Sequence, residues 1–192
     1  MNWSRHIRSS FVLLVFFSLL TGLVYPLVVY GLGQAVFSHQ ADGSLISVQG
    51  QIIGSSLIGQ DFTMDIYFHP RPSYAGQGYD ARASGGSNLG PTSTDLLDAV
   101  HKRVLALGTS GVSFVPVDLV TSSASGLDPD ISLAAAHIQI ARVAEARHAS
   151  VAEVGAIVEA NVITRTFGVL GENRLNVLQL NQALDQSMPV KQ

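Results

Sequence analysis

The sequence predicts a mixed α+β (irregular α/β) soluble domain behind a single N-terminal transmembrane helix. Residues 11–32 form an apolar run without a charged side chain. The remaining chain contains stretches with helical spacing of apolar residues and short strand-like stretches, but no repeating βαβ rhythm. No internal repeat or linker divides this part, so a chain of 192 residues is expected to form one modest domain and the extra apolar segment.

The apolar run predicts an uncleaved membrane anchor. A helix needs about 20 mostly apolar residues to cross the hydrocarbon core, and residues 11–32 meet that length. The apolar part of a signal peptide has only about 7 to 15 residues and ends at a small-x-small cleavage site. The following GQAVFSHQADG contains no convincing site of that kind.

The distribution of basic residues predicts the orientation of the anchor. Arg5 and Arg8 precede the run, and no Lys or Arg follows it until Arg71. Positive charge collects on the cytoplasmic side of membrane proteins. We therefore expect residues 1–10 to be cytoplasmic and residues 38–192 to form the extracytoplasmic domain.

The first half of the soluble part is expected to hold little regular structure. Residues 44–58 alternate apolar residues with glycine and predict short strands. Residues 67–93 contain too much Gly, Pro and Ser for helix or strand, yet carry tyrosines and arginines, which favours a long structured loop that serves as a docking surface.

A helix is predicted over residues 94–107, ended by Gly108. Residues 115–121 are expected to form a strand. The apolar face of the predicted helix consists of Leu97, Val100, Val104 and Leu107.

Residues 120–147 combine a polar turn with an amphipathic helix that starts near Ser132. The turn is rich in Ser, Gly and Asp, residues whose side chains bond to the local backbone. Helix capping is the favoured role of Asp128, Asp130 and Ser132, and metal binding by the two aspartates is the alternative. The apolar stripe is expected to contain Leu133, Ala136, Ile140, Val143 and Ala144, with Gln139, Arg142 and Glu145 pointing elsewhere.

The C-terminal part predicts two more helices. Ser150 and Glu153 have the spacing of a capping box before an apolar run. The chain then turns at Gly168 and Gly171, and Asn176 is a suitable cap for a final docked helix.

Motifs of known chemistry are missing from the sequence. There is no Walker A sequence, HExxH or GxSxG, and the histidines lack metal-ligand spacing. The absence of cysteine excludes disulfides and thiolate sites, and a net charge of −3 gives no bias toward nucleic acid. Residues 84–90, SGGSNLG, could form an anion nest, although a tight turn needs the same residues. We assign no catalytic and no metal-binding residue.

Several long motifs resemble the C subunits of the bacterial high-affinity potassium-transporting Kdp ATPase, a P-type ATPase complex. They are RPSYAGQGYD, SGGSNLGPTS, VPVDLVTSSASGLDPDIS, AAAHIQIARVAEAR and LGENRLNVLQLNQAL. The resemblance covers nearly the whole chain, including the N-terminal span. The chain departs from the family pattern at Leu133 and Asn173, where the family usually has proline.

This resemblance implies a non-catalytic subunit of the bacterial inner membrane. Its implied partners are a channel-like A subunit that handles potassium, a P-type ATPase B subunit and a small F subunit. The family is described as needed for assembly and as a catalytic chaperone that raises the ATP affinity of the ATPase subunit. Because ATP is hydrolysed in the cytoplasm and the soluble domain is expected outside, an allosteric route is the favoured interpretation.

If ATP binds this chain, the resemblance nominates Ser123, Ser125, Gly126 and Gln139 as nucleotide-binding residues. A structural turn and helix cap is the competing interpretation of the same residues. Two hypotheses from other classes stay open, a stand-alone membrane-anchored envelope serine hydrolase and a solute-binding sensor.

Overall fold

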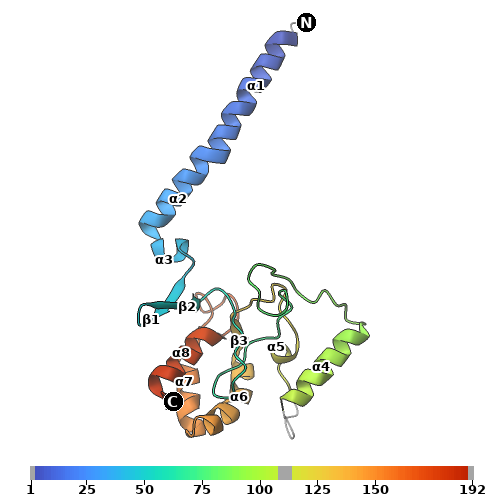
Figure 1. Cartoon of the computed structure of the whole chain (residues 1–192), viewed down its shortest axis with the longest axis vertical. Coiled ribbons are helices and arrows are strands. Elements are labelled where there is room, and N and C mark those ends of the chain that lie inside the picture. The colour runs from blue at the N-terminus through green and yellow to red at the C-terminus, as the bar shows by residue number, and fades with distance from the viewer. Residues whose placement is uncertain (1–2, 108–113, 190–192) are drawn as a thin grey trace. The chain divides into compact units, whose positions relative to one another are not determined.

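The computed structural model describes residues 3–107 and 114–189, and the chain divides into two compact units, residues 1–45 and 46–192. The first unit is a long helical segment formed by α1 (Trp3–Leu19), a π-helical turn (Leu20–Val24) and α2 (Tyr25–Val36). The short α3 (Ser38–Ala41) follows it (Figure 1). The segment Trp3–Val36 contains an 18-residue stretch with a mean hydropathy of 2.5 and is long and apolar enough to span a membrane, as predicted.

The π-helical turn was not predicted, and it lies directly before the proline of the span. Pro26 occupies the first turn of α2, where the missing N–H and the ring interrupt the regular hydrogen-bond ladder. Thr21 donates its hydroxyl to the carbonyl of Phe17 at 2.7 Å and so satisfies one acceptor near this irregularity. A proline inside a spanning helix is tolerated when such adjustments satisfy the freed backbone groups.

The predicted strands form a tight hairpin of β1 (Leu45–Val48) and β2 (Gln51–Ser55), and all of the hairpin after Leu45 belongs to the second unit. Gln49 and Gly50 connect them with φ values of 52° and 80°. Positive φ at both central residues matches the right-handed twist of the strands, so the two-residue turn fixes the hairpin register.

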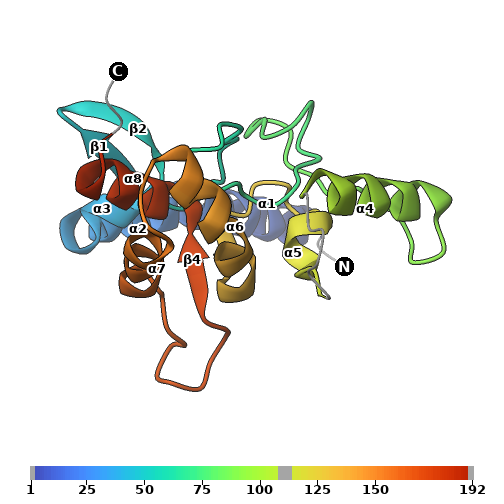
Figure 2. The ribbon, with the colours of Figure 1, turned by 90° about the horizontal axis from the view of Figure 1, so that it is seen from below.

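Three helices surround the core of the second unit. They are α6 (Leu133–Ala146), α7 (Val151–Ala160) and α8 (Val177–Ser187), with α7 packed against both α6 and α8 (Figure 2). The predicted caps are present at all three: the side-chain oxygens of Ser132, Ser150 and Asn176 accept backbone N–H groups, and Ser150 forms a full capping box with Glu153. Fully buried core side chains include Phe68, Val143, Val154, Val158, Leu175, Leu180 and Leu184.

Two short strands were not predicted. β3 (Asp130–Ser132) pairs antiparallel with β4 (Arg174–Asn176), with Ile131 opposite Leu175. Arg174 also bridges to Ile163, so a hairpin of residues 163–174 extends this small sheet. The sheet therefore joins the start of α6 to the start of α8.

The segment between the hairpin and the core helices is largely irregular, as predicted for residues 67–93. The helix expected at residues 94–107 is α4 (Thr94–Ala106); Gly108, expected to end it, lies outside the described residues. Its predicted apolar face is only partly correct. Leu107 packs against the core, whereas Leu97 is 60% exposed.

The strand predicted at residues 115–121 is wrong. The chain forms the single helical turn α5 (Val117–Val120) instead. Pro116 precedes the first helical position and Asp118 lies in the first turn, where both residue types suit a helix start. The Arg103 side chain of α4 donates to the Val120 carbonyl at 2.8 Å and ties the two helices together.

Candidate functional site at the junction of residues 118 to 132

The serine turn nominated for nucleotide binding is closed by its own side chains. The Ser123 hydroxyl accepts the Gly126 N–H at 2.9 Å, and the Ser125 hydroxyl accepts the Leu127 N–H at 3.1 Å. Gly126 has φ +66°, and a Cβ there would lie 2.6 Å from the carbonyl oxygen of Gly85. The turn thus needs glycine for both conformation and space.

The long loop holds this turn from the other side. The Ser73 hydroxyl donates to the Gly126 carbonyl at 2.6 Å, and the Ser84 hydroxyl donates to the Ser125 carbonyl at 2.9 Å. The Gly85 N–H also donates to the Ser125 carbonyl, at 2.9 Å, so this part of the SGGSNLG segment contacts the turn. The loop and the serine turn are one structural unit.

Gln139, the fourth nucleotide candidate, is buried inside the domain. The sequence pattern placed it off the apolar face, yet its residue is only 3% exposed. Its side-chain oxygen accepts from the His69 N–H at 2.7 Å and from Arg142 at 2.9 Å. Its amide nitrogen donates to the carbonyls of His69 and Ala135, each at 3.2 Å. The prediction that Gln139 points away from the core was therefore wrong. A polar side chain can be buried in place of an apolar one when all its hydrogen bonds are satisfied.

Gln139 also lines a cavity of about 510 Å³ together with His69, Arg71, Tyr79 and Arg103. None of the three turn candidates lines it. Burial, together with the charge of Arg142, lowers the pKa of His69. Burial also raises the pKa of Tyr79, whose hydroxyl donates to the Arg71 carbonyl.

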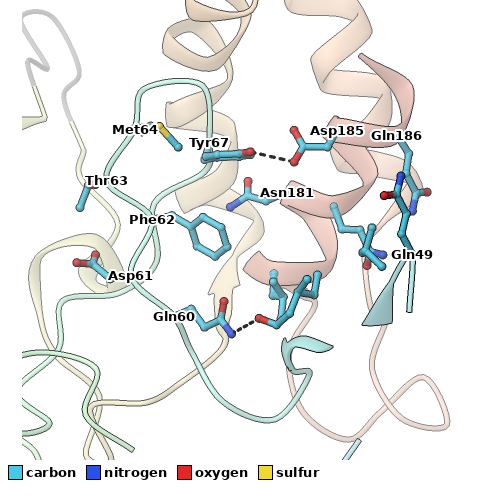
Figure 3. A pocket seen from close by; sticks show the side chains of 14 residues that line it. Gln49, Gln60, Asp61, Phe62, Thr63, Met64, Tyr67, Asn181, Asp185 and Gln186 are labelled. Atoms are coloured by element: carbon cyan, nitrogen blue, oxygen red, sulfur yellow. Dashed lines mark hydrogen bonds between the residues drawn. The ribbon is translucent and has the colours of Figure 1, made fainter. Parts of the chain in front are cut away.

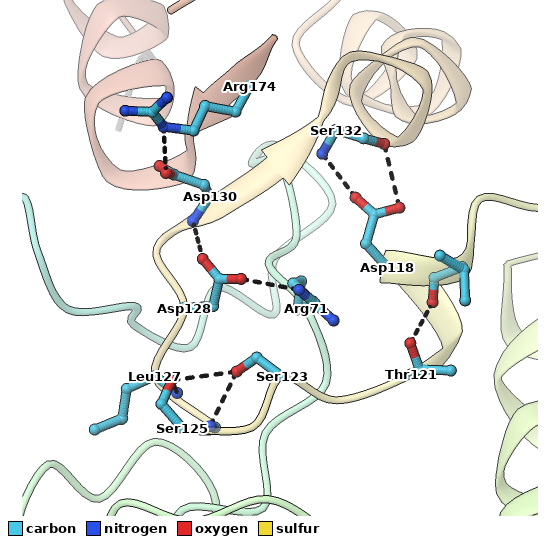
Figure 4. A network of polar contacts seen from close by, with 12 residues as sticks. Arg71, Asp118, Thr121, Ser123, Ser125, Leu127, Asp128, Asp130, Ser132 and Arg174 are labelled. Atoms are coloured by element: carbon cyan, nitrogen blue, oxygen red, sulfur yellow. Dashed lines mark hydrogen bonds and ion pairs between the residues drawn. The ribbon is translucent and has the colours of Figure 1, made fainter. Parts of the chain in front are cut away.

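The two aspartates of the junction form ion pairs (Figure 4). Asp128 contacts Arg71 at 2.9 Å, and Asp130 contacts Arg174 at 2.8 Å. Asp128 also accepts the Asp130 N–H at 3.1 Å. Neither carboxylate caps α6, because Ser132 alone of the three candidates does so, and the part of the chain that the structure describes contains no cluster of metal-ligating side chains.

Asp118 is a residue of this junction that the sequence did not single out. Its carboxylate accepts the Ser132 N–H at 2.7 Å and the Ser132 hydroxyl at 3.2 Å (Figure 4). The N–H groups of Asp130 and Ser132 lie on the edge of β3 that does not pair with β4. The carboxylates of Asp128 and Asp118 accept hydrogen bonds from these two groups. Carboxylates on such an edge block further strand pairing. The only feature of the sequence that could have drawn attention to Asp118 is its position two residues after Pro116.

A second cavity, of about 630 Å³, lies between the segment of residues 60–67, α8 and the β1–β2 hairpin (Figure 3). Tyr67 donates its hydroxyl to Asp185 at 2.9 Å, and Arg147 contacts the same carboxylate at 2.8 Å. The Arg147 guanidinium also lies over the Tyr67 ring, 5.1 Å from its centroid. Burial and the Asp185 hydrogen bond raise the pKa of Tyr67.

Two polar side chains beside this second cavity, Asn181 and Gln60, form hydrogen bonds with the backbone. Asn181 accepts the Phe68 N–H at 2.8 Å and donates to the Phe68 carbonyl at 3.0 Å. Gln60 donates to the Ile53 carbonyl at 2.9 Å. These contacts fix the irregular segment onto α8 and β2, so these polar side chains serve to order the loop.

Comparison with known proteins gives a consistent result along the chain. Residues 7–186 match the family model described as the c chain of the K⁺-transporting ATPase. Proteins called "Potassium-transporting ATPase KdpC subunit" are 50% identical in Mycobacterium tuberculosis (strain H37Rv) and 51% identical in Acidobacterium capsulatum, each over 95% of this chain and 98% of the relative. The protein of that name from Rhodospirillum rubrum is 51% identical over 97% of this chain and 98% of its own. The chain therefore belongs to the family of KdpC subunits of potassium-transporting ATPases.

Proposed function

We propose that this chain is a non-catalytic accessory subunit of a potassium-transporting P-type ATPase in the bacterial inner membrane. The observation that carries the proposal is the match to KdpC subunits over residues 7–186. The apolar helix Trp3–Val36 supports it, because a subunit of a membrane pump needs a way to stay beside its partners. Its partners would be a channel-like A subunit that handles potassium, the ATPase B subunit and a small F subunit.

Assembly is tested by solubilising the native membrane in mild detergent and identifying what copurifies with the tagged chain. We expect the A, B and F subunits in fixed proportion, and loss of high-affinity potassium uptake when residues 46–192 are deleted. Recovery of the chain alone from membranes that contain the other subunits would contradict the proposal. Normal uptake supported by residues 1–45 would contradict it as well.

The proposed topology places residues 1–10 in the cytoplasm and the second unit outside. Arg5 and Arg8 support this orientation. Because the chain has no cysteine, single cysteines report each side cleanly. A membrane-impermeant maleimide should label Ala152→Cys, an exposed position of α7, in intact spheroplasts, and should label Ser4→Cys only after lysis. The opposite pattern would reverse the topology.

The chain is further proposed to raise the ATP affinity of the ATPase subunit by an indirect route. The hydrogen bonds of Ser123, Ser125 and Gln139 support this choice, since their side chains already serve the domain itself. An accessory subunit can act in this way if it binds one conformational state of the pump more tightly than the other. ATP should then leave the thermal unfolding of the isolated full chain unchanged; a concentration-dependent stabilisation would favour direct nucleotide binding instead.

A further inference from the structure

An open groove runs along the small sheet of β3 and β4 in the second unit. It has a volume of about 620 Å³. Its walls come from residues 114–118, from the β3 region, and from the base of the 163–174 hairpin. We call it the acidic groove. The charged side chains among its lining residues are Arg71, Asp118, Asp128, Asp130, Glu172 and Arg174.

Carboxylates outnumber guanidinium groups in the acidic groove. Asp128 and Asp130 are neutralised by Arg71 and Arg174, and Glu172 pairs with Arg165 of the hairpin, so Asp118 is the carboxylate that is left. Asp118 is only 9% exposed and accepts two hydrogen bonds from Ser132. Within residues 3–107 and 114–189, no lysine, arginine or histidine side chain forms an ion pair with its carboxylate. A buried carboxylate without a counter-ion carries a desolvation cost that a partner's cation would offset. The charge of the groove therefore favours a basic ligand.

Exposed apolar side chains border the acidic groove. Phe114 and Val117, on one wall, are 74% and 67% exposed. The hairpin whose base lines the groove carries Phe167 and Val169 at its tip, 90% and 74% exposed. Figure 2 shows this hairpin, which joins α7 to β4, projecting from the core helices. Exposed apolar groups gathered in this way are typical of interaction sites.

The hairpin tip is ordered by its own contacts. The N–H groups of Val169 and Leu170 both donate to the Thr166 carbonyl, and the Thr166 N–H donates to the Leu170 carbonyl at 2.9 Å. Arg165 pairs with Glu172 at 2.8 Å across the hairpin. Phe167 adopts φ 55°, a conformation that disfavours a bulky side chain. The hairpin therefore holds an unfavourable backbone conformation at the residue whose aromatic side chain is the most exposed of the tip.

We propose that the acidic groove and the hairpin tip bind a segment of another subunit that carries lysine or arginine between apolar side chains. This rests on the proposed function, which supplies a protein complex for the surface to join. The aromatic tip would act as the anchor that fills an apolar pocket, as interface hot spots do. An anionic lipid surface is disfavoured, because Arg165 is neutralised by Glu172 and the groove has excess carboxylate.

Asn173 offers a test by charge, since it lines the groove and is exposed. Asn173→Lys should reduce copurification of the partner subunits at least about fivefold, because like charges repel a basic segment. Asn173→Asp should retain them at least as well as the unchanged chain. Ala152→Lys, on exposed α7, is the matched control and should have no effect. Equal recovery with Asn173→Lys and Asn173→Asp would overturn the proposal.

The apolar part has its own test. Phe167→Ser should lower recovery of the partner subunits about tenfold, whereas Val151→Ser, which removes an apolar side chain 59% exposed on α7, should not. Unchanged recovery with Phe167→Ser overturns the assignment. Binding of the unchanged chain to vesicles with anionic lipid that Phe167→Ser abolishes would point to a membrane occupant, and a homodimer in native mass measurement that Phe167→Ser abolishes would point to a second copy; either result overturns it. If the unchanged chain recovers no partners, the proposed function itself has failed.

Discussion

Gly126 shows how one backbone position organises the junction. Its carbonyl accepts from Ser73, and its N–H donates to Ser123. Its left-handed conformation and the closeness of Gly85 and Ala75 leave no room for a side chain. The position therefore couples a local turn to the long loop, whose Ser73 lies 53 residues earlier in the sequence.

Gly126→Ala should be markedly more destabilising than Gly168→Ala. Both glycines have positive φ, so each substitution costs about 1 to 2 kcal/mol for the left-handed conformation. At Gly168 the new Cβ meets nothing within 4 Å, whereas at Gly126 it meets backbone atoms at 2.6 and 2.7 Å. We expect a further cost of about 1 to 3 kcal/mol there. Denaturant unfolding of the detergent-solubilised chain measures both, and equal losses would show that the loop yields at no cost.

His69 should make the domain sensitive to acid. Burial and Arg142 lower its pKa in the folded chain, so the unfolded chain binds the proton more readily. Its contribution to stability is complete above the unfolded pKa of about 6.5 and is lost as the pH falls toward the lower folded pKa. The melting temperature of His69→Gln should therefore fall less between neutral and mildly acidic pH than that of the unchanged chain. Parallel curves for the two proteins would contradict this.

The sequence predicted the candidate site only where the signal was local. Ser132 was identified as a cap because the cap and its amide lie three residues apart. Asp118 and Arg174 were missed, since their roles depend on residues brought together by the sheet. Gln139 was nominated through family resemblance, and its buried hydrogen bonds to residue 69 could not be read from helical spacing.

At the scale of elements, the predictions that rest on local signals are correct, and those that depend on contacts between distant segments are missing or wrong. The β1–β2 hairpin and the helices α4, α6, α7 and α8 follow from glycine turns, caps and apolar spacing close to each element. β3 and β4 have three residues each and exist because distant segments pair, so no local pattern announces them. The apolar segment at α5 was assigned as a strand because a short apolar run fits either state.

Arg147 ties three elements together and should tolerate little change. Its guanidinium donates to the carbonyls of Ile66 and Met188 at 2.7 and 2.8 Å and contacts Asp185 at 2.8 Å, with only 1% of the side chain exposed. Lysine cannot donate in these fixed directions at once, so buried acceptors would lose partners. Arg147→Lys should lower the free energy of unfolding by about 2 kcal/mol.

Arg82→Lys is the matched control for that substitution, since the Arg82 side chain is 92% exposed. Its effect should stay within about 0.5 kcal/mol. Chemical denaturation of the two variants in the same detergent gives the comparison. Equal stability of both variants would mean that the Arg147 contacts with Ile66, Met188 and Asp185 contribute nothing net to stability.

At the scale of the whole molecule, the chain combines a helix fit to span a membrane with a domain whose polar groups mainly order its own loops. Family membership assigns this combination to a potassium-transporting ATPase. We propose two roles for these parts. The helix and the outer surface of the domain hold the chain to its partners, and the chain affects ATP use indirectly, through the conformation of the pump.

The most direct test of this account is the ATP concentration that gives half-maximal potassium-stimulated ATPase activity, measured in membranes with and without the chain. We expect the half-saturating concentration to rise severalfold when the chain is absent or truncated to residues 1–45, and to return when the full chain is restored. It should also rise with Phe167→Ser, which leaves the serine turn intact. The same half-saturating ATP concentration in the presence and absence of the chain would contradict the account.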